Sequence, residues 1–354
     1  MSTTRGFLHM SFDLDHYFPE RVNDSPWLAA HTLNHLLQLP ADRELILPIC
    51  SLGTRFEELS ELGSCVLPPL YHEALGGRLK QQILERITIC FPYHELCESR
   101  HRKHPQLRIV ELPPRQAPAV SAPRILAFSV DTAVEEHGPH LPLSTDTLQS
   151  YAVLQRLAQE TDGLLVGPPL EYGQLTWGLP FGFSVDLTAD LLREYVRNFA
   201  NAMLDWIDPE SLFVVDVHGS QIHRTAIVEG LQASQSRRFR FRWLHEPLVG
   251  FAADRGDQHA GGVETALIEF INPQLVDPDH WPDGIDALAD KQMPFATAVE
   301  LTPDLAQFTR YVEKHSLNGI VGDIYNYRQL DSAVLMSDML NTARLDLQQL
   351  STNP

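Results

Sequence analysis

The sequence predicts an α/β fold in which a parallel sheet is covered by helices. Three short apolar runs, at 125–130, 164–166 and 212–217, have the composition of buried strands. Stretches with apolar residues at helical spacing follow the first two, at 145–161 and from Thr188 onward. Alternation of this kind is typical of a layered α/β sheet.

The first hundred residues show the same alternation on a smaller scale. Apolar residues at helical spacing predict a helix at 26–39, and Glu44 to Cys50 predicts a strand. A further helix is expected near 78–86 and a further strand at 87–91. This segment therefore predicts a smaller α/β unit of its own.

A stretch rich in proline and small residues separates the two parts. We predict an N-terminal α/β extension at 1–112, an extended linker at 113–123, and the main domain at 124–354. The segments 45–51 and 67–71 echo 125–130 and 167–172. Convergent strand and turn chemistry explains this echo more simply than a degenerate repeat.

The remaining elements of the main domain follow from local patterns. Thr188 is a suitable N-cap for the helix after it. The alternating run 238–243 predicts a strand with one solvated face. A helix is expected to begin within 259–271, and the last long helix spans about 331–350.

Composition and charge exclude several classes of function. Lys and Arg number 27 against 46 Asp and Glu, which gives a formal net charge of −19. Such a charge argues against nucleic acid or an anionic membrane as a partner. We expect a cytoplasmic protein, because no apolar leader or spanning run is evident. The four cysteines match no zinc pattern and are expected to be buried thiols, with a disulfide as the less favoured alternative.

The segment 135–146 concentrates the groups that bind metals. Glu135 and His137 are two residues apart, so their side chains point the same way on extended backbone, and Asp146 closes the segment. Carboxylate and imidazole are ligands for Zn²⁺, Mn²⁺ or Fe²⁺. The segment therefore predicts half of a metal site.

Later segments offer the other half. His218 follows a predicted strand, and His259 and Glu264 lie where a helix is expected to begin. Sites in such sheets gather at the carboxyl ends of strands. Each residue alone has a simpler explanation, because an isolated His after a strand is usually structural and an early helical Glu usually offsets the helix dipole. Their combination favours a site.

The run Glu-x-His-Gly-Pro-His-Leu-Pro-Leu-x-x-Asp at 135–146 resembles the signature of the creatininase (creatinine amidohydrolase) family. Two later segments, His218-Gly219 and 259–265, are similar to its second and third motifs, and Gly322-Asp323 also fits. The resemblance covers roughly residue 123 to the C-terminus.

The resemblance implies a three-layer α/β/α fold, often assembled as a homohexamer, with two divalent metal ions. It carries over five ligands, with Asp146 bridging the metals and Glu135 and His137 on different ions. It also carries over His259 as the acid/base near the leaving nitrogen. The five implied metal ligands are Glu135, His137, Asp146, His218 and Glu264.

Departures from the family pattern concern the second motif. Asp216, Ser220 and Gln221 replace residues usual in the family, and Ser220 stands where creatininase proper has a ligand Glu. This argues against creatinine as the substrate and favours Glu264 as the fifth ligand. Asp216 would add a negative charge beside the site.

The leading functional hypothesis is hydrolysis of a cyclic amide or formamide C–N bond by metal-activated water. A peptidase acting on a small or precursor peptide is the alternative, and a non-catalytic binding protein of the same fold is a third. The substrate is thus a small molecule or a short peptide. Four aromatic residues are candidates for lining its pocket: Tyr172, Trp177, Phe181 and Phe183.

Overall fold

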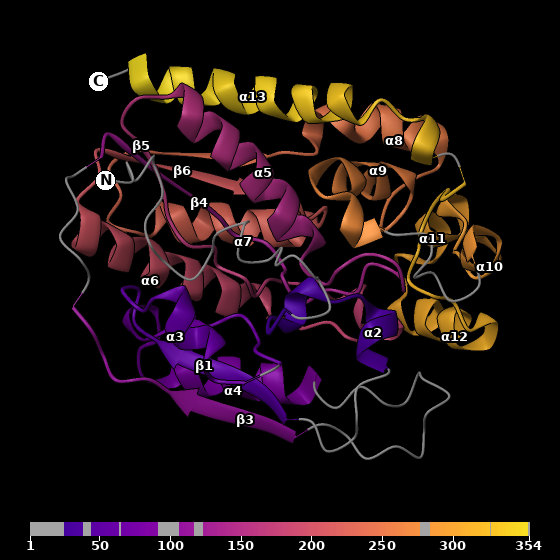
Figure 1. Cartoon of the computed structure of the whole chain (residues 1–354), viewed down its shortest axis with the longest axis horizontal. Coiled ribbons are helices and arrows are strands. Elements are labelled where there is room, and N and C mark those ends of the chain that lie inside the picture. The colour runs from indigo at the N-terminus through magenta and orange to yellow at the C-terminus, as the bar shows by residue number, and fades with distance from the viewer. Residues whose placement is uncertain are drawn as a thin grey trace.

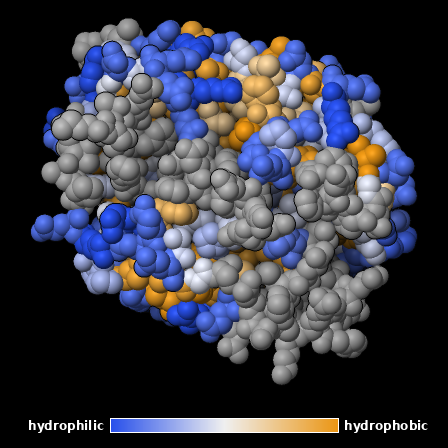
Figure 2. Space-filling view, viewed as in Figure 1, coloured by the Kyte–Doolittle hydropathy of each residue, from blue (hydrophilic) through white to orange (hydrophobic). Residues whose placement is uncertain are grey.

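A computed structural model describes residues 25–37, 44–63, 65–90, 106–116, 123–276, 284–325 and 327–352. Two separate parallel sheets lie one above the other, with helices between them and above the larger sheet (Figure 1). Figure 2 shows one face of the molecule, on which the described residues are mostly hydrophilic with small apolar groups between them. No helix in the described ranges is long and apolar enough to cross a membrane.

The larger sheet has the strand order β5-β4-β6-β7, and every pair in it is parallel. Its strands are β4 (Ile125–Ser129), β5 (Leu164–Val166), β6 (Ser211–Asp216) and β7 (Phe239–Trp243). The central strands β4 and β6 are buried along their whole length, as parallel strands covered on both faces must be. The edge strand β7 is half-exposed, in line with its alternating sequence.

Helices cover both faces of this sheet (Figure 1). One face carries α5 (Thr145–Glu160), α9 (Gly262–Ile271) and α13 (Ser332–Thr352), and the other carries α6 (Ala189–Ile207) and α7 (Gln221–Gln232). The three-layer α/β/α arrangement expected from the sequence is therefore confirmed. Thr188 caps α6, since its side chain accepts a hydrogen bond from the Leu191 amide.

Short helices gather beside one end of the sheet (Figure 1). They are α8 (Val249–Arg255), α10 (Gly284–Asp290), α11 (Phe295–Leu301) and α12 (Leu305–His315). Single turns of 3-10 helix lie at Leu28–Ala30, His72–Ala74, Leu179–Phe181, Glu246–Leu248, Pro273–Val276 and Tyr327–Gln329. The turn at 179–181, with α11 and α12, encloses a small apolar cluster apart from the main core.

The N-terminal sheet has the order β2-β1-β3, again all parallel. It consists of β1 (Glu44–Cys50), β2 (Leu70–Tyr71) and β3 (Gln106–Glu111), with helices α2 (Leu33–Leu37), α3 (Phe56–Ser60) and α4 (Arg78–Cys90). It lies on the α6 side of the larger sheet (Figure 1), and one continuous apolar cluster spans both sheets. The two parts thus share a core across the α6 layer.

The sequence echo has a counterpart in topology. The central strand β1 lies between β2 and β3, just as β4 lies between β5 and β6. Each central strand leads through a helix to its first neighbour along the chain. Parallel α/β units commonly have this order, so the origin of the echo stays open.

Two element predictions for the N-terminal region are wrong. The helix expected at 26–39 is interrupted, because Thr32 forms an antiparallel bridge with Pro142, and residues 38–40 lie outside the described ranges. The strand expected at 87–91 is helical through Cys90. Leu79, Ile83 and Ile87 recur every four residues on the buried face of α4, so helical packing outweighs the β-branched composition.

The linker and the cysteines are described in part. Residues 112–116 have no regular secondary structure, 117–122 lie outside the described ranges, and the domain boundaries stay a prediction. Cys50 and Cys65 are buried and Cys90 is half-buried, whereas Cys97 is not described. Burial raises the pKa of the Cys50 thiol to about 12, so this thiol is unreactive at neutral pH.

Candidate metal centre

The loop between β4 and α5 positions the first three candidate residues. Glu135 and His137 lie in this loop, and Asp146 lies in the first turn of α5. The loop turns back on itself, since the Glu135 amide donates to the Leu143 carbonyl at 3.3 Å. All three side chains are buried. Residues eleven positions apart are thereby brought to one point.

Two other elements bring the remaining residues to the same point. His218 follows β6, whose carboxyl end lies beside that of β4 because the two strands are parallel neighbours. Glu264 lies in the first turn of α9, which packs against α5. The Ala260 amide donates to the Glu264 carboxylate at 2.6 Å and fixes its direction. All five candidate ligands therefore come together at the carboxyl ends of the strands.

The distances separate these five residues into two groups that share Asp146. The Nδ1 atom of His218 is 3.1 Å from Oε2 of Glu135 and 3.5 Å from Oδ2 of Asp146. The Nε2 atom of His137 is 3.3 Å from Oδ1 of Asp146 and 3.9 Å from Oε2 of Glu264. Each group offers three ligand atoms within 4.8 Å of one another.

The orientation of His137 suits a metal ligand. Its Nδ1 atom donates to the Glu135 carbonyl at 3.1 Å, which leaves the Nε2 atom directed at the carboxylates. That Nε2 atom is buried and has no hydrogen-bond partner within the described part of the chain. An imidazole held through one nitrogen with the other free is the usual arrangement of a metal-binding histidine. The donor set thus fits a divalent cation.

Opposite charges within the cluster shift its pKa values strongly. Burial lowers the pKa of His137, but Asp146 and Glu264 outweigh burial and raise it to about 10. Burial also lowers the pKa of His218, but Glu135 and Asp146 outweigh burial and hold this pKa well above its usual range. Burial alone would raise the pKa of both carboxylates. The two imidazoles outweigh burial, so the pKa of Glu135 lies below its ordinary value and the pKa of Asp146 lies well below its own.

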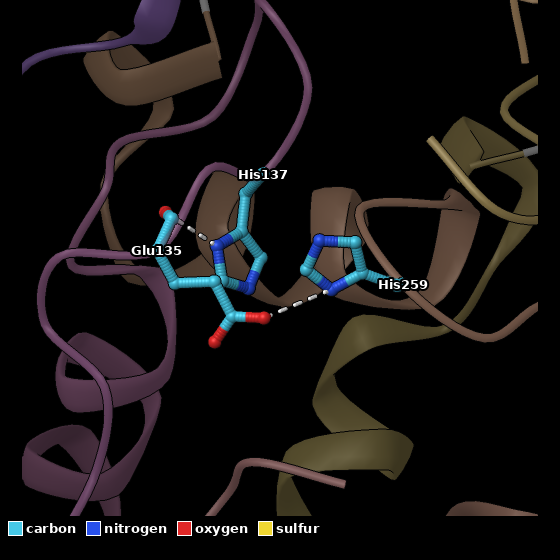
Figure 3. A group of neighbouring side chains, drawn as sticks. All are labelled: Glu135, His137 and His259. Carbon is cyan, nitrogen blue, oxygen red and sulfur yellow. Dashed lines mark hydrogen bonds and ion pairs between the residues drawn. The ribbon is translucent and has the colours of Figure 1, made fainter. Parts of the chain in front are cut away.

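His259, three residues before α9, faces Glu135 and His137 (Figure 3). Its Nε2 atom donates to the Glu136 carbonyl at 2.9 Å, so the Nδ1 atom faces Glu135, 3.7 Å from Oε1. Its ring centroid is 4.4 Å from that of His137. With Glu135 and His137 it forms a third group of possible ligand atoms. Its side chain is 20% exposed and lines the cavity beside the cluster.

Several residues at the site carry no signal in the sequence. The hydroxyl of Thr132 contacts the carboxylates of both Glu135 and Asp146. The Glu136 carboxylate is fully buried and accepts from the Gly138 amide at 3.0 Å. Only proximity in the fold reveals such supporting contacts.

Three further polar residues surround the cluster. His140 lies with Nε2 2.9 Å from the Thr265 hydroxyl. His245, in the cavity wall, lies with Nε2 2.8 Å from Gln149. Burial raises the pKa of Asp216 well above its usual range even though His218 opposes this shift, so the negative charge expected there is disfavoured.

A cavity of about 390 Å³ opens from the cluster. Its polar end is formed by Glu135, Asp146, His218, His259 and Glu264, and its apolar end by Trp177, Phe181, Phe295, Ala298, Phe308 and Val321. The Phe308 ring lies 5.1 Å from Trp177 and 5.7 Å from Phe181, edge-on to both. Of the four aromatic candidates, Trp177 and Phe181 line the cavity, whereas Tyr172 and Phe183 are core residues.

Residues 125–342 match the family described as Creatininase: Creatinine amidohydrolase. The chain belongs to the creatininase family. Among solved structures it is similar to creatinine amidohydrolase (creatininase), with a TM-score of 0.47 and 19% identity over 65% of this chain and 91% of that one. A mutant creatininase described as Zn–Zn type also matches, over 64% of this chain and 90% of that one, with the same TM-score and identity.

The curated relatives of this creatininase-family chain are peptidases. It is 31% identical over 160 residues to the mycofactocin precursor peptide peptidase of Mycobacterium ulcerans, covering 43% of this chain and 60% of the relative. The enzyme of the same name from Mycobacterium tuberculosis is 26% identical over 163 residues, covering 43% and 61%. The chain thus spans about three fifths of the length of these relatives.

Proposed function

We propose that this protein is a dinuclear metal-dependent peptidase that cleaves a short or precursor peptide. Glu135, Asp146 and His218 would hold one divalent ion, and His137, Asp146 and Glu264 the other, so that Asp146 bridges the two. Carboxylate and imidazole donors suit Zn²⁺, Mn²⁺ or Fe²⁺. The convergence of these five buried side chains on one cavity supports the proposal and disfavours a non-catalytic binding protein.

The side chains around the cavity have distinct tasks in such a reaction. Bound metal ions would supply a hydroxide near neutral pH and polarise the amide carbonyl. His259 faces the cluster through Nδ1 while the Glu136 carbonyl holds its Nε2, so it is placed to pass a proton to the departing nitrogen. The Thr132 hydroxyl orients the carboxylates of Glu135 and Asp146, and the Glu135 carbonyl orients the His137 ring.

A peptide suits this cavity better than the cyclic amide or formamide ranked first from the sequence. The cavity continues beyond the polar cluster into an apolar end around Phe308. A small cyclic amide would leave that end unfilled, whereas a side chain beside the scissile peptide bond would bury apolar surface there. The relatives named as precursor peptide peptidases likewise favour a peptide over a cyclic amide or formamide as the substrate.

Substrate preference tests this proposal. We expect the protein, purified with Zn²⁺ or Mn²⁺, to cleave short peptides with a large apolar residue next to the scissile bond in preference to creatinine, cyclic amides or formamides. Phe308→Ala should raise KM for such peptides about tenfold while changing little for peptides with Ser at that position. Phe270→Ala, on the exposed side of α9, is the control. Preference for creatinine, cyclic amides or formamides would contradict the peptidase proposal. Equal losses on both peptides would contradict the role of the apolar end in holding the side chain beside the scissile bond.

Metal affinity should depend steeply on pH. Because its raised pKa of about 10 keeps His137 protonated at neutral pH, metal binding has to displace that proton. The apparent affinity for Zn²⁺ should therefore rise about tenfold per pH unit, between pH 7 and 8.5, for each proton released. Titration against a competing chelator measures the affinity, and an indicator dye in weak buffer counts the protons. An affinity independent of pH would contradict the release of protons from His137 and His218 on metal binding.

A further inference from the structure

The N-terminal region contacts the metal-binding loop directly through residues 26–32, which we name the brace. The Leu143 amide donates to the His31 carbonyl at 3.0 Å, and the Ser144 amide donates to the Ala29 carbonyl at 2.8 Å. Thr32 bridges Pro142 in antiparallel fashion. The brace thus binds the main chain of the loop just before Asp146.

The other edge of the brace is fixed to the N-terminal sheet. Leu28 donates to the Val66 carbonyl at 2.9 Å, and Val66 donates to the Pro26 carbonyl at 2.6 Å. Val66 in turn bridges Ile46 in β1. Trp27 is fully buried, with its ring 4.8 Å from that of Phe56. The brace therefore links β1 to the metal-binding loop through main-chain hydrogen bonds.

The position of Leu143 shows why this link matters for the site. Its amide binds the brace, while its carbonyl accepts from the Glu135 amide. Ser144, the next residue bound by the brace, is the N-cap of the helix whose first turn carries Asp146. Leu143 and Ser144 are buried, so loss of the brace would leave two buried amides without acceptors.

We propose that the brace is a positioning element for the metal centre, although it lies outside the family match at 125–342. It sets the spacing between the loop residue Glu135 and the helix residue Asp146 by holding the chain between them at Leu143 and Ser144. The N-terminal extension is then part of the site's support and not an independent module. This inference rests on the metal centre in the proposed function.

One matched pair of substitutions in the full-length protein isolates a single brace contact. Ser144→Pro removes the amide that donates to Ala29, whereas Ser144→Ala keeps it; among the described residues the Ser144 hydroxyl has no partner to lose. We expect Ser144→Pro to weaken Zn²⁺ binding at least tenfold and Ser144→Ala to stay within about twofold of the wild type. Equal Zn²⁺ affinities in the two variants would overturn the proposal.

A second pair acts from the N-terminal side and keeps the proposal testable if Ser144→Pro does not fold. Trp27→Ala disturbs the brace, and Ile83→Ala removes an equally buried side chain from α4. Both should lower Tm, but only Trp27→Ala should weaken Zn²⁺ binding. If Ile83→Ala weakens it as much, the effect is general destabilisation and the brace has no special role.

Hydrogen exchange of the metal-free protein separates failure of the brace from failure of the metal centre. The amides of Leu143 and Ser144 should be protected in the wild type and in Ile83→Ala, and should exchange faster in Trp27→Ala. This result would stand even if the wild type bound no Zn²⁺, an outcome that would overturn the proposed function alone. Unchanged protection in Trp27→Ala would overturn the brace.

Discussion

Asp146→Ala is expected to abolish binding of both metal ions and to remove hydrolytic activity. Asp146 is the one candidate ligand shared by the two main groups, with its carboxylate oxygens 3.3 Å from His137 and 3.5 Å from His218. Its loss would leave each ion with two ligands, and the bridge between the ions would be gone. Elemental analysis should give well under about one metal per chain, against about two in the wild type.

Two further variants separate the loss of the Asp146 charge from the loss of its side-chain volume and from removal of an acidic residue elsewhere. Asp146→Asn keeps the size of the side chain and removes the charge, so it should lose metal without the cavity that Ala creates. Asp190→Ala, at an exposed position of α6, should keep full metal content. If Asp146→Ala retains two ions per chain, Asp146 is not the bridge and the assignment of the two groups fails.

The strands of the larger sheet could be predicted because burial on both faces leaves a continuous apolar run. β4 and β6 have such runs, and both begin and end within a residue or two of the expected limits. The segment 87–91 has similar composition but belongs to a helix. Ile89 is 69% exposed there, which shows that a β-branched residue was placed by helical periodicity and not by burial.

The candidate site could be predicted because its residues stand at the ends of recognisable elements. His218 follows an apolar strand that lies beside β4, and Glu264 lies early in a helix that packs against α5, so both come near the loop of Glu135. The hydroxyl of Thr132 and the wall residue His245 have no such marker. Their roles depend on side-chain directions that neither periodicity nor spacing encodes.

Contacts between distant segments set the other limit to prediction. The brace joins His31 to Leu143 through main-chain atoms, and main-chain hydrogen bonds place no requirement on residue type. No pattern in residues 26–32 could therefore reveal that they contact the loop that carries the candidate metal ligands. The expected homohexamer remains a prediction for the same reason, because a surface between copies leaves no periodic signal in one chain.

His259→Ala is expected to keep both metal ions and to lower kcat about 10²- to 10⁴-fold, the range typical of losing a general acid. Its Nε2 atom is held by the Glu136 carbonyl, and its Nδ1 atom faces the polar end of the cavity. KM for the peptide should change little, because the apolar end of the cavity around Phe308 is untouched. Steady-state kinetics and metal analysis on the same preparation measure both effects.

Metal content decides between two roles for His259. His259 lies close enough to Glu135 and His137 to serve as a metal ligand. If His259→Ala loses one ion per chain, His259 is a ligand and not the acid. Full metal content with full activity would exclude both roles. His315→Ala, at an exposed position of α12, controls for removal of a histidine from the surface. Only loss of turnover with metal retained supports proton transfer, because that transfer needs the imidazole to face the cluster without being bound by it.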